Sequence, residues 1–207
     1  MQYKKDEVKE RIDKAALAVF SSKGYGNTKI ADIAAKANVS VGNIYLYYKG
    51  KDDIFYSIVP ESFWESLKSL LFNKIGMFRE DLGNQIGSIM INRDFIKYLI
   101  ENRERMLILF TGSDGTRYEN IKEQLVNFLI ATIKEHYFEE YRQQLEEERK
   151  GEVIIKKVYQ NLLDLYFGLL KEEETIEGLQ SDLKMINEYH LFGITGLLKI
   201  KNQGKLE

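Results

Sequence analysis

The sequence of 207 residues contains no cysteine and a single proline, Pro60. Without cysteine the chain can form no disulfide, no thiolate metal site and no cysteine nucleophile. The scarcity of proline and of alternating apolar and polar runs argues against a β-rich fold, whose strands need frequent turns between them. Because 44% of the residues are hydrophobic, enough for a buried core, we expect a folded protein of the all-α class.

Long apolar runs are missing as well. No segment approaches the roughly 18 apolar residues that a helix needs to cross a bilayer. The first residues, MQYKKDEVKERIDK, lack the apolar centre of a signal peptide. We therefore expect a cytoplasmic protein with no membrane partner.

Catalytic and metal-binding motifs are also missing. The histidines His136 and His190 complete neither a His-x-x-x-His pair nor the Glu-x-x-His spacing of helical di-metal sites. Glu139 and Glu140 follow His136, but a solvated charged face explains this run better than a ligand pair. The loop TGSDGT, residues 111–116, has no lysine and no strand before it, which favours a turn between helices over a phosphate loop. We expect no enzyme, no cofactor and no metal site.

Charged residues of both signs are present but unevenly placed. Residues 1–59 hold 10 Lys and Arg against 7 Asp and Glu, whereas residues 60–207 hold 20 against 25. This asymmetry predicts a small basic domain at residues 1–59 and a larger acidic domain at residues 60–207.

The spacing of apolar residues predicts helices in the first domain. The first is expected at Lys4–Ser22, with Gly24 as its stop. Asn27 or Thr28 is expected as the N-cap of a short second helix, and Asn38 ends it because asparagine tolerates the left-handed backbone of a tight turn.

Ser40 is the expected N-cap of a third helix, Val41–Tyr48, and a fourth helix opens at GKDDIF and continues past Pro60 with a kink. Two helices joined by a turn of three or four residues form a helix-turn-helix, a unit of DNA-binding proteins. Longer helices are expected at residues 86–101, 103–110, 118–149, 152–171 and 176–201.

A helical wheel divides the third helix into three faces. They are a buried side with Val41, Ile44 and Tyr48, an opposite side with Gly42, Asn43 and Leu46, and flanks with Tyr45 and Tyr47. In a DNA major groove, Gly42 would let the backbone come close, Asn43 could bond adenine in two places, and Lys49 and Lys51 would lie near phosphates. The alternative is a short core helix with half-exposed tyrosines.

The stretch RIDKAALAVFSSKGYGNTKIADIAAKANVSVGNIYLYYKGKDDIF, Arg11 to Phe55, resembles the N-terminal DNA-binding domain of the TetR family of bacterial transcriptional regulators. The resemblance covers about residues 6–66, with the helix-turn-helix at residues 29–48. The family commonly has glycine at the position of Asn38 and phenylalanine at that of Tyr48, whose hydroxyl then needs a partner. By resemblance, the positions that contact DNA in relatives are Thr28, Ser40, Val41, Gly42, Asn43, Tyr45, Tyr47 and Lys51.

The resemblance further implies a C-terminal helical domain, residues 60–207, that binds a small effector and forms a homodimer. The helices expected at Glu152–Lys171 and Ile176–Lys201 carry apolar residues on more than one face, a pattern that fits either a dimer contact or deep burial within one subunit. The resemblance implies the dimer contact. The expected function is that of a repressor released from a palindromic operator in double-stranded DNA by a small apolar or aromatic effector. The alternative is a helical ligand-binding or scaffold protein with a vestigial helix-turn-helix.

Overall fold

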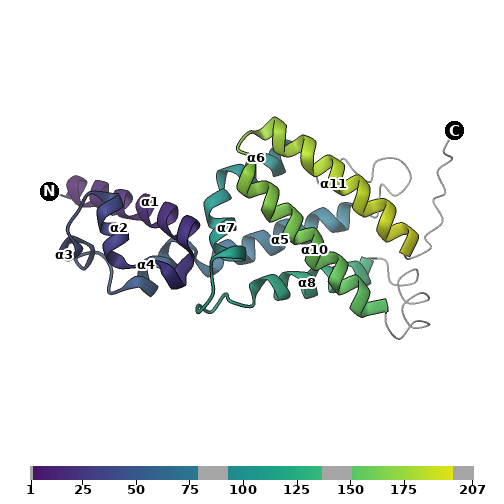
Figure 1. Cartoon of the computed structure of the whole chain (residues 1–207), viewed down its shortest axis with the longest axis horizontal. Coiled ribbons are helices and arrows are strands. Elements are labelled where there is room, and N and C mark those ends of the chain that lie inside the picture. The colour runs from purple at the N-terminus through teal and green to yellow at the C-terminus, as the bar shows by residue number, and fades with distance from the viewer. Residues whose placement is uncertain (1, 79–92, 137–150, 198–207) are drawn as a thin grey trace. The chain divides into compact units, whose positions relative to one another are not determined.

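The computed structural model of the chain describes residues 2–78, 93–136 and 151–197 (Figure 1). All regular secondary structure in these ranges is helical, which confirms the predicted all-α class. The helices are α1 (Gln2–Asn27), α2 (Ile30–Ala37), α3 (Val41–Ile44), α4 (Lys51–Ile58), α5 (Glu61–Phe78), α6 (Arg93–Glu101), α7 (Arg103–Thr111), α8 (Ile121–His136), α10 (Gly151–Glu172) and α11 (Ile176–Leu197). Over the same ranges, no helix is both long and apolar enough to cross a membrane.

The chain forms two units. Unit 1 consists of residues 1–65 and 102–121, and unit 2 of residues 66–101 and 122–207. Residues 102–121 therefore pack with the N-terminal helices, although they lie beyond the predicted domain boundary at residues 59 and 60. That boundary, as a division of function, stays a prediction.

Two glycines bring the end of α1 against the end of α7 within unit 1. Gly24 has a non-helical backbone (φ 73°, ψ 166°), so the predicted stop at this residue is a break inside a longer helix. The next residue, Tyr25, donates its backbone N–H to the Gly112 carbonyl at 2.7 Å. A Cβ on Gly112 would lie 3.2 Å from the Gly24 Cα, closer than most side chains tolerate. Glycine at both positions therefore permits a direct contact between backbones.

Aromatic rings fill the space between α1, α4 and the loop after α7. The Phe55 ring packs edge-on against Phe20, with centroids 5.4 Å apart, and against Tyr25 at 5.1 Å.

Two side chains hydrogen-bond the end of α4. Arg105 Nε donates to the Ile58 carbonyl at 2.9 Å and the Tyr118 hydroxyl donates to the Val59 carbonyl at 3.3 Å. These two bonds satisfy carbonyls at the end of α4, which the helix itself cannot pair.

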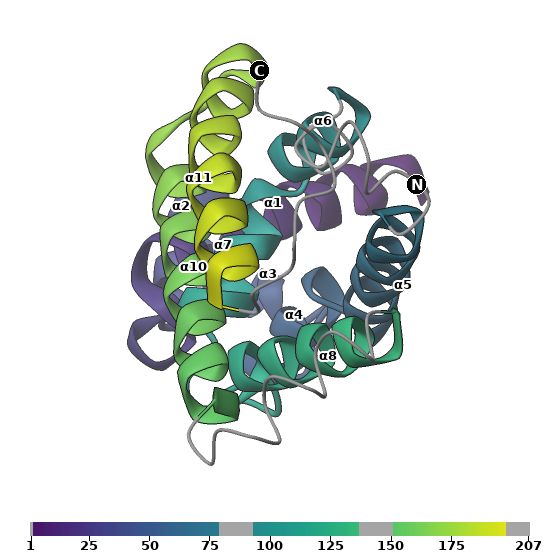
Figure 2. The same ribbon diagram turned by 90° about the vertical axis from the view of Figure 1, so that its right-hand side faces the viewer.

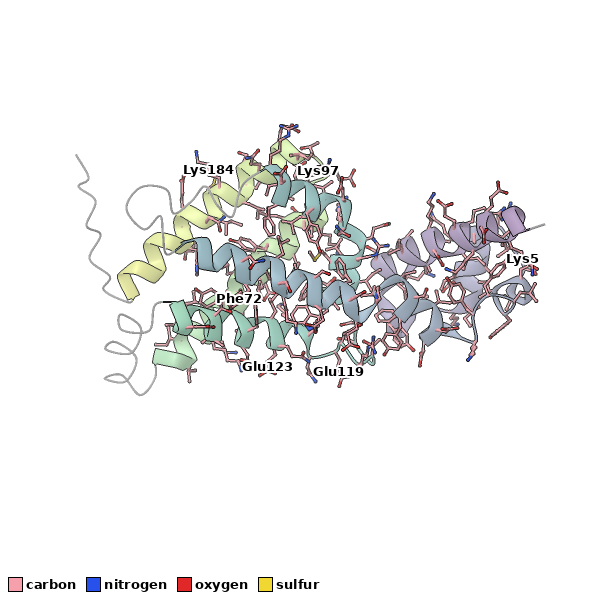
Figure 3. All side chains as sticks on the ribbon, turned by 180° about the vertical axis from the view of Figure 1, so that it is seen from behind. Lys5, Phe72, Lys97, Glu119, Glu123 and Lys184 are labelled. Atoms are coloured by element: carbon pink, nitrogen blue, oxygen red, sulfur yellow. The ribbon has the colours of Figure 1, made fainter. Side chains whose placement is uncertain are left out.

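Unit 2 is held by helix pairs and by ion pairs at their edges. Helix α10 lies beside α11, as Figure 2 shows, and α6 also packs on α11. Glu123 of α8, labelled in Figure 3, accepts from Lys156 of α10 at 2.7 Å. Between α10 and α11, the rings of Tyr159 and His190 meet with centroids 5.1 Å apart, and burial lowers the pKa of His190 to about 4.

Some predicted helix bounds agree with the structure, and others need correction. Helices α7 and α10 lie within one residue of the predicted ranges, and α11 begins at the predicted residue. Helix α8 begins at Ile121 instead of Tyr118, because Ser113 and Thr116 hydrogen-bond within the preceding loop and hold it as a turn. Pro60 separates α4 from α5 and does not kink one continuous helix. The predicted helical residues 86–92, 137–149 and 198–201 lie outside the described ranges.

Replacing Gly24 with alanine tests the backbone break. The Gly24 conformation is one that glycine adopts almost alone, so Gly24→Ala is expected to lower the free energy of unfolding by about 1–3 kcal/mol. The matched control is Gly26→Ala, where an added Cβ meets nothing within 4 Å and the change should be neutral or slightly stabilising. Chemical denaturation of the two variants measures the difference, and equal stabilities would show that the break carries no strain.

Candidate nucleic-acid interface

The third helix is held by two buried side chains. Ile44 is fully buried and Tyr48 is 4% exposed. The Tyr48 hydroxyl donates to Asp13 of α1 and lies 3.3 Å from the Ser57 hydroxyl of α4. Burial, followed by the bond to Asp13, raises the pKa of Tyr48. The hydroxyl that the sequence predicts to need a partner therefore has one, and it ties the helix-turn-helix to α1.

A second link between α1 and the helix-turn-helix comes from Arg11. Its Nη2 donates to the carbonyls of Ala37 at 2.9 Å and Asn38 at 3.0 Å. These carbonyls end α2, where the helix leaves its acceptors unpaired. Asn38 has the left-handed backbone that its sequence position predicts (φ 53°, ψ 51°). Arg11 thus fixes the turn from outside, a role that its sequence context does not reveal.

The caps of α2 and α3 agree only in part with the predictions. The Ser40 hydroxyl accepts from the Asn43 N–H at 3.2 Å, so its predicted N-cap role is confirmed. Neither Asn27 nor Thr28 caps α2, because Lys29 occupies that position. Its backbone N–H donates to the Asp32 carboxylate at 3.0 Å.

The predicted third helix over Val41–Tyr48 is too long. Helix α3 ends at Ile44, and the chain continues in tighter turns, in which Leu46 N–H donates to the Asn43 carbonyl at 3.2 Å and Tyr47 N–H to that of Ile44 at 2.9 Å. Val41, predicted to be buried, is 40% exposed. The helical wheel assumes one regular helix over eight residues, and this assumption is wrong after Ile44. Of the three side chains predicted to be buried, only Ile44 and Tyr48 reach the core.

The remaining residues form one exposed surface, which we call the recognition face. Tyr45 is 55% exposed and Leu46, predicted on the side opposite the core, is 78% exposed. Tyr47 is half-buried. The recognition face consists of Val41, Gly42, Asn43, Tyr45, Leu46 and Tyr47.

The other three predicted contacts have roles inside the protein. The Thr28 side chain is 2% exposed and donates to the Gly24 carbonyl at 2.7 Å. Lys51 Nζ donates to the Tyr25 carbonyl at 2.8 Å and lies 4.0 Å from the centre of the Tyr25 ring. Ser40 caps α3. Their contacts with DNA stay predictions, and the geometry favours the recognition face over Thr28 and Lys51.

Three lysines of the helix-turn-helix region are exposed, while two carboxylates of the same region are engaged. Lys29, Lys36 and Lys49 are exposed. Asp32 accepts from the Lys29 backbone and pairs with Lys23 at 3.1 Å, which lowers its pKa. Asp53 accepts from the Lys49 N–H at 2.9 Å. The surface thus presents cations beside a neutral, partly apolar centre, an arrangement suited to phosphates on either side of a groove.

The described residues contain no group of three or more His, Cys, Asp or Glu side chains that could hold a metal ion. Glu139 and Glu140 lie outside these residues. The loop at residues 111–116 ends α7 and turns toward α8, as predicted, with Ser113 donating to the Leu109 carbonyl at 2.8 Å.

The burial of Tyr48 and the exposure of Tyr45 give a matched pair of variants. Tyr48→Ala is expected to lower the free energy of unfolding by about 3 kcal/mol or more, because it leaves a cavity and removes the Asp13 bond. Tyr45→Ala should change it by no more than about 0.5 kcal/mol, as surface substitutions do. Urea denaturation of both variants compares them, and similar losses would contradict the assignment of Tyr45 to the exposed face.

Comparisons with known proteins agree with this geometry. A family model described as "Bacterial regulatory proteins, tetR family" matches residues 12–58. The uncharacterized HTH-type transcriptional regulator YerO of Bacillus subtilis is 23% identical over 181 residues, which cover 87% of this chain and 52% of YerO. The fatty acid metabolism regulator protein of Bacillus subtilis is 34% identical over 70 residues, 34% of this chain and 36% of that protein. The chain thus spans about half or less of the length of these relatives.

A solved structure shares the fold. The crystal structure of a TetR-like transcriptional regulator from Rhodococcus sp. RHA1 superposes with a TM-score of 0.52 at 19% identity, covering 90% of this chain and 96% of that one. At this identity the likeness concerns the fold alone. Residues 12–58, which contain the helix-turn-helix, thus match the TetR family of bacterial regulatory proteins, and the described chain shares the fold of a TetR-like regulator.

Proposed function

We propose that the chain is a transcriptional repressor that binds a palindromic operator as a homodimer and leaves it when a small apolar or aromatic molecule binds. The observation that carries the proposal is the recognition face, an exposed surface on a short helix whose position is fixed by Ile44, Tyr48 and Arg11. The match of residues 12–58 to a family of bacterial regulatory proteins supports a regulatory role instead of an enzymatic one.

The recognition face fits a DNA major groove residue by residue. Gly42 has no side chain, and a Cβ there would meet only the Ser40 hydroxyl within 4 Å, at 3.8 Å, so the backbone can approach the bases. Asn43 is exposed on the first turn of α3 and can bond adenine in two places. The hydroxyls of Tyr45 and Tyr47 can reach phosphates, and Lys49 adds charge beside them.

A palindrome requires two such faces related by a two-fold axis. Helices α10 and α11 carry large apolar side chains on the surface of unit 2, which supports the dimer contact predicted for them. Met185 and Tyr189 lie one turn apart on α11 and are 70% and 76% exposed. Ile154 and Leu165 are exposed on α10. Burying these side chains against a second copy would remove apolar surface from water.

Release by an effector requires a link between a ligand site and the recognition face. The ligand would bind within the helical domain at residues 60–207, for which the family resemblance implies a small effector. Residues 102–121 offer the link, because α7 follows α6 and precedes α8 in the chain while its own contacts are to α1 and α4. A ligand that binds one arrangement of α6 and α8 more tightly would shift the population of α7 positions. The two recognition faces would then no longer match successive major grooves, and the protein would leave the operator.

The first test is selection of a binding site from random duplex DNA, followed by titrations at several salt concentrations. Specific binding should weaken steeply with salt, and Lys49→Ala should lower the slope of log K against log salt by about one unit per subunit. Lys184→Ala, on the exposed surface of α11, is the control and should keep the wild-type slope. Failure to recover any specific duplex would favour the alternative of a helical ligand-binding or scaffold protein.

The second test concerns the dimer. Tyr189→Glu would place a charge in the apolar contact and is expected to raise the dimer dissociation constant at least tenfold, an energy of about 1.4 kcal/mol. Lys184→Glu on the same helix is the control and should remain dimeric. Sedimentation at micromolar concentration measures both, and a stable wild-type monomer would refute the proposed contact.

A further inference from the structure

The recognition face lacks the side chains that usually read guanine. Guanine is most often recognised by arginine or lysine, which bond its O6 and N7 together. Residues 40–47 read SVGNIYLY and contain neither. The exposed cations lie outside this segment, at Lys36 on α2 and Lys49 after the turn, where phosphate contacts are the natural use. The centre of the face therefore offers an amide and apolar groups instead of cations.

Asn43 and Leu46 stand on the same side of the chain. The Leu46 N–H bonds the Asn43 carbonyl at 3.2 Å, which closes a turn of the tighter, three-residue type. In such a turn, side chains three residues apart eclipse one another. Gly42, one residue before Asn43, adds no side chain that could cover either of them. The amide and the isobutyl group are thus presented together toward the same partner.

Leu46 is the most exposed of the large hydrophobic side chains in the described residues, at 78%. A single exposed leucine is common on protein surfaces. This one lies beside an amide that can bond adenine, on the surface proposed to enter the groove. The apolar group that the major groove displays is the 5-methyl of thymine, and adenine pairs with thymine. An amide and a leucine side chain that lie side by side can therefore contact the adenine of one A·T pair and the methyl group of an adjacent thymine.

We propose that this protein selects A·T base pairs at the centre of each operator half-site, with the Asn43 amide on adenine N6 and N7 and the Leu46 side chain on the 5-methyl group of an adjacent thymine. The inference rests on the proposed function and deepens it, since it names the bases that the recognition face reads. Contact between Leu46 and the methyl group removes both from water, so affinity depends on a single methyl group in the DNA.

Replacing thymine by uracil in the selected operator tests the inference, because it removes only the 5-methyl group. Each thymine is replaced in turn, symmetrically in both half-sites, and binding is measured with the whole chain of 207 residues. Wild-type protein is expected to lose about fourfold in affinity per half-site at one position, the value of one buried methyl group. Leu46→Ala should bind thymine and uracil operators equally at that position, with an unchanged unfolding midpoint.

Two variants control for other causes. Leu46→Met keeps an apolar side chain and should retain the loss on uracil substitution. Tyr45→Phe removes only a predicted phosphate bond, so it should weaken binding to both operators alike and keep their ratio. A uracil scan with no effect on the wild type, a uracil effect that persists in Leu46→Ala, or a selected half-site with only G·C pairs at its centre would each overturn the inference while DNA binding stands. If no specific duplex is recovered, the proposed function fails and the inference with it.

Discussion

The recognition face depends on the burial of two side chains. Helix α3 has four residues, far fewer than a helix needs to be stable alone in water. Its position comes from Ile44 and Tyr48, which enter the core formed with α1 and α4, and from the Tyr48 bond to Asp13. With the inward side chains held in this way, the outward ones are displayed in a fixed arrangement without contributing to stability themselves.

The same unit joins parts of the chain that are distant in sequence. Arg11 reaches the end of α2 across 26 residues, and Arg105 reaches the end of α4 across 47. Both arginines donate to carbonyls that their target helices leave unpaired. Lys9 also donates to Asp13, at 2.8 Å, beside the Tyr48 hydroxyl. Polar groups at helix ends, together with the aromatic rings around Phe55, thus connect the recognition face to α7.

Local chemistry explains which features could be predicted from the sequence. Asn38 and Ser40 act through their own backbone and immediate neighbours, so the left-handed turn and the cap of α3 follow from residue type and position. The burial of Ile44 and Tyr48 follows from their spacing along the predicted helix. Threonine is a residue type typical of N-caps, but the Thr28 hydroxyl instead donates to the Gly24 carbonyl, four residues earlier in α1. The prediction that Val41 is buried is wrong, because α3 has a single turn and its first residue stays exposed.

Long-range contacts explain which features could not be predicted. No periodicity shows that residues 102–121 pack beside α1, since this depends on Gly24 and Gly112 meeting across 88 residues of chain. The Arg11 cap is hidden for the same reason, because a surface arginine on α1 looks like any other. The C-terminal part of the chain carries no motif from which a ligand site could be predicted.

The contacts of residues 102–121 have a consequence for how this protein can be divided. The carbonyls of Ile58 and Val59 are paired with Arg105 and Tyr118, and the Tyr25 N–H is paired with Gly112. A fragment cut after residue 65 would keep every residue of the helix-turn-helix but would expose Phe55 and leave these backbone groups to water. The N-terminal segment is therefore not a portable module. Moving the recognition face to another protein therefore requires a complete host, because the excised segment lacks its contacts with residues 102–121.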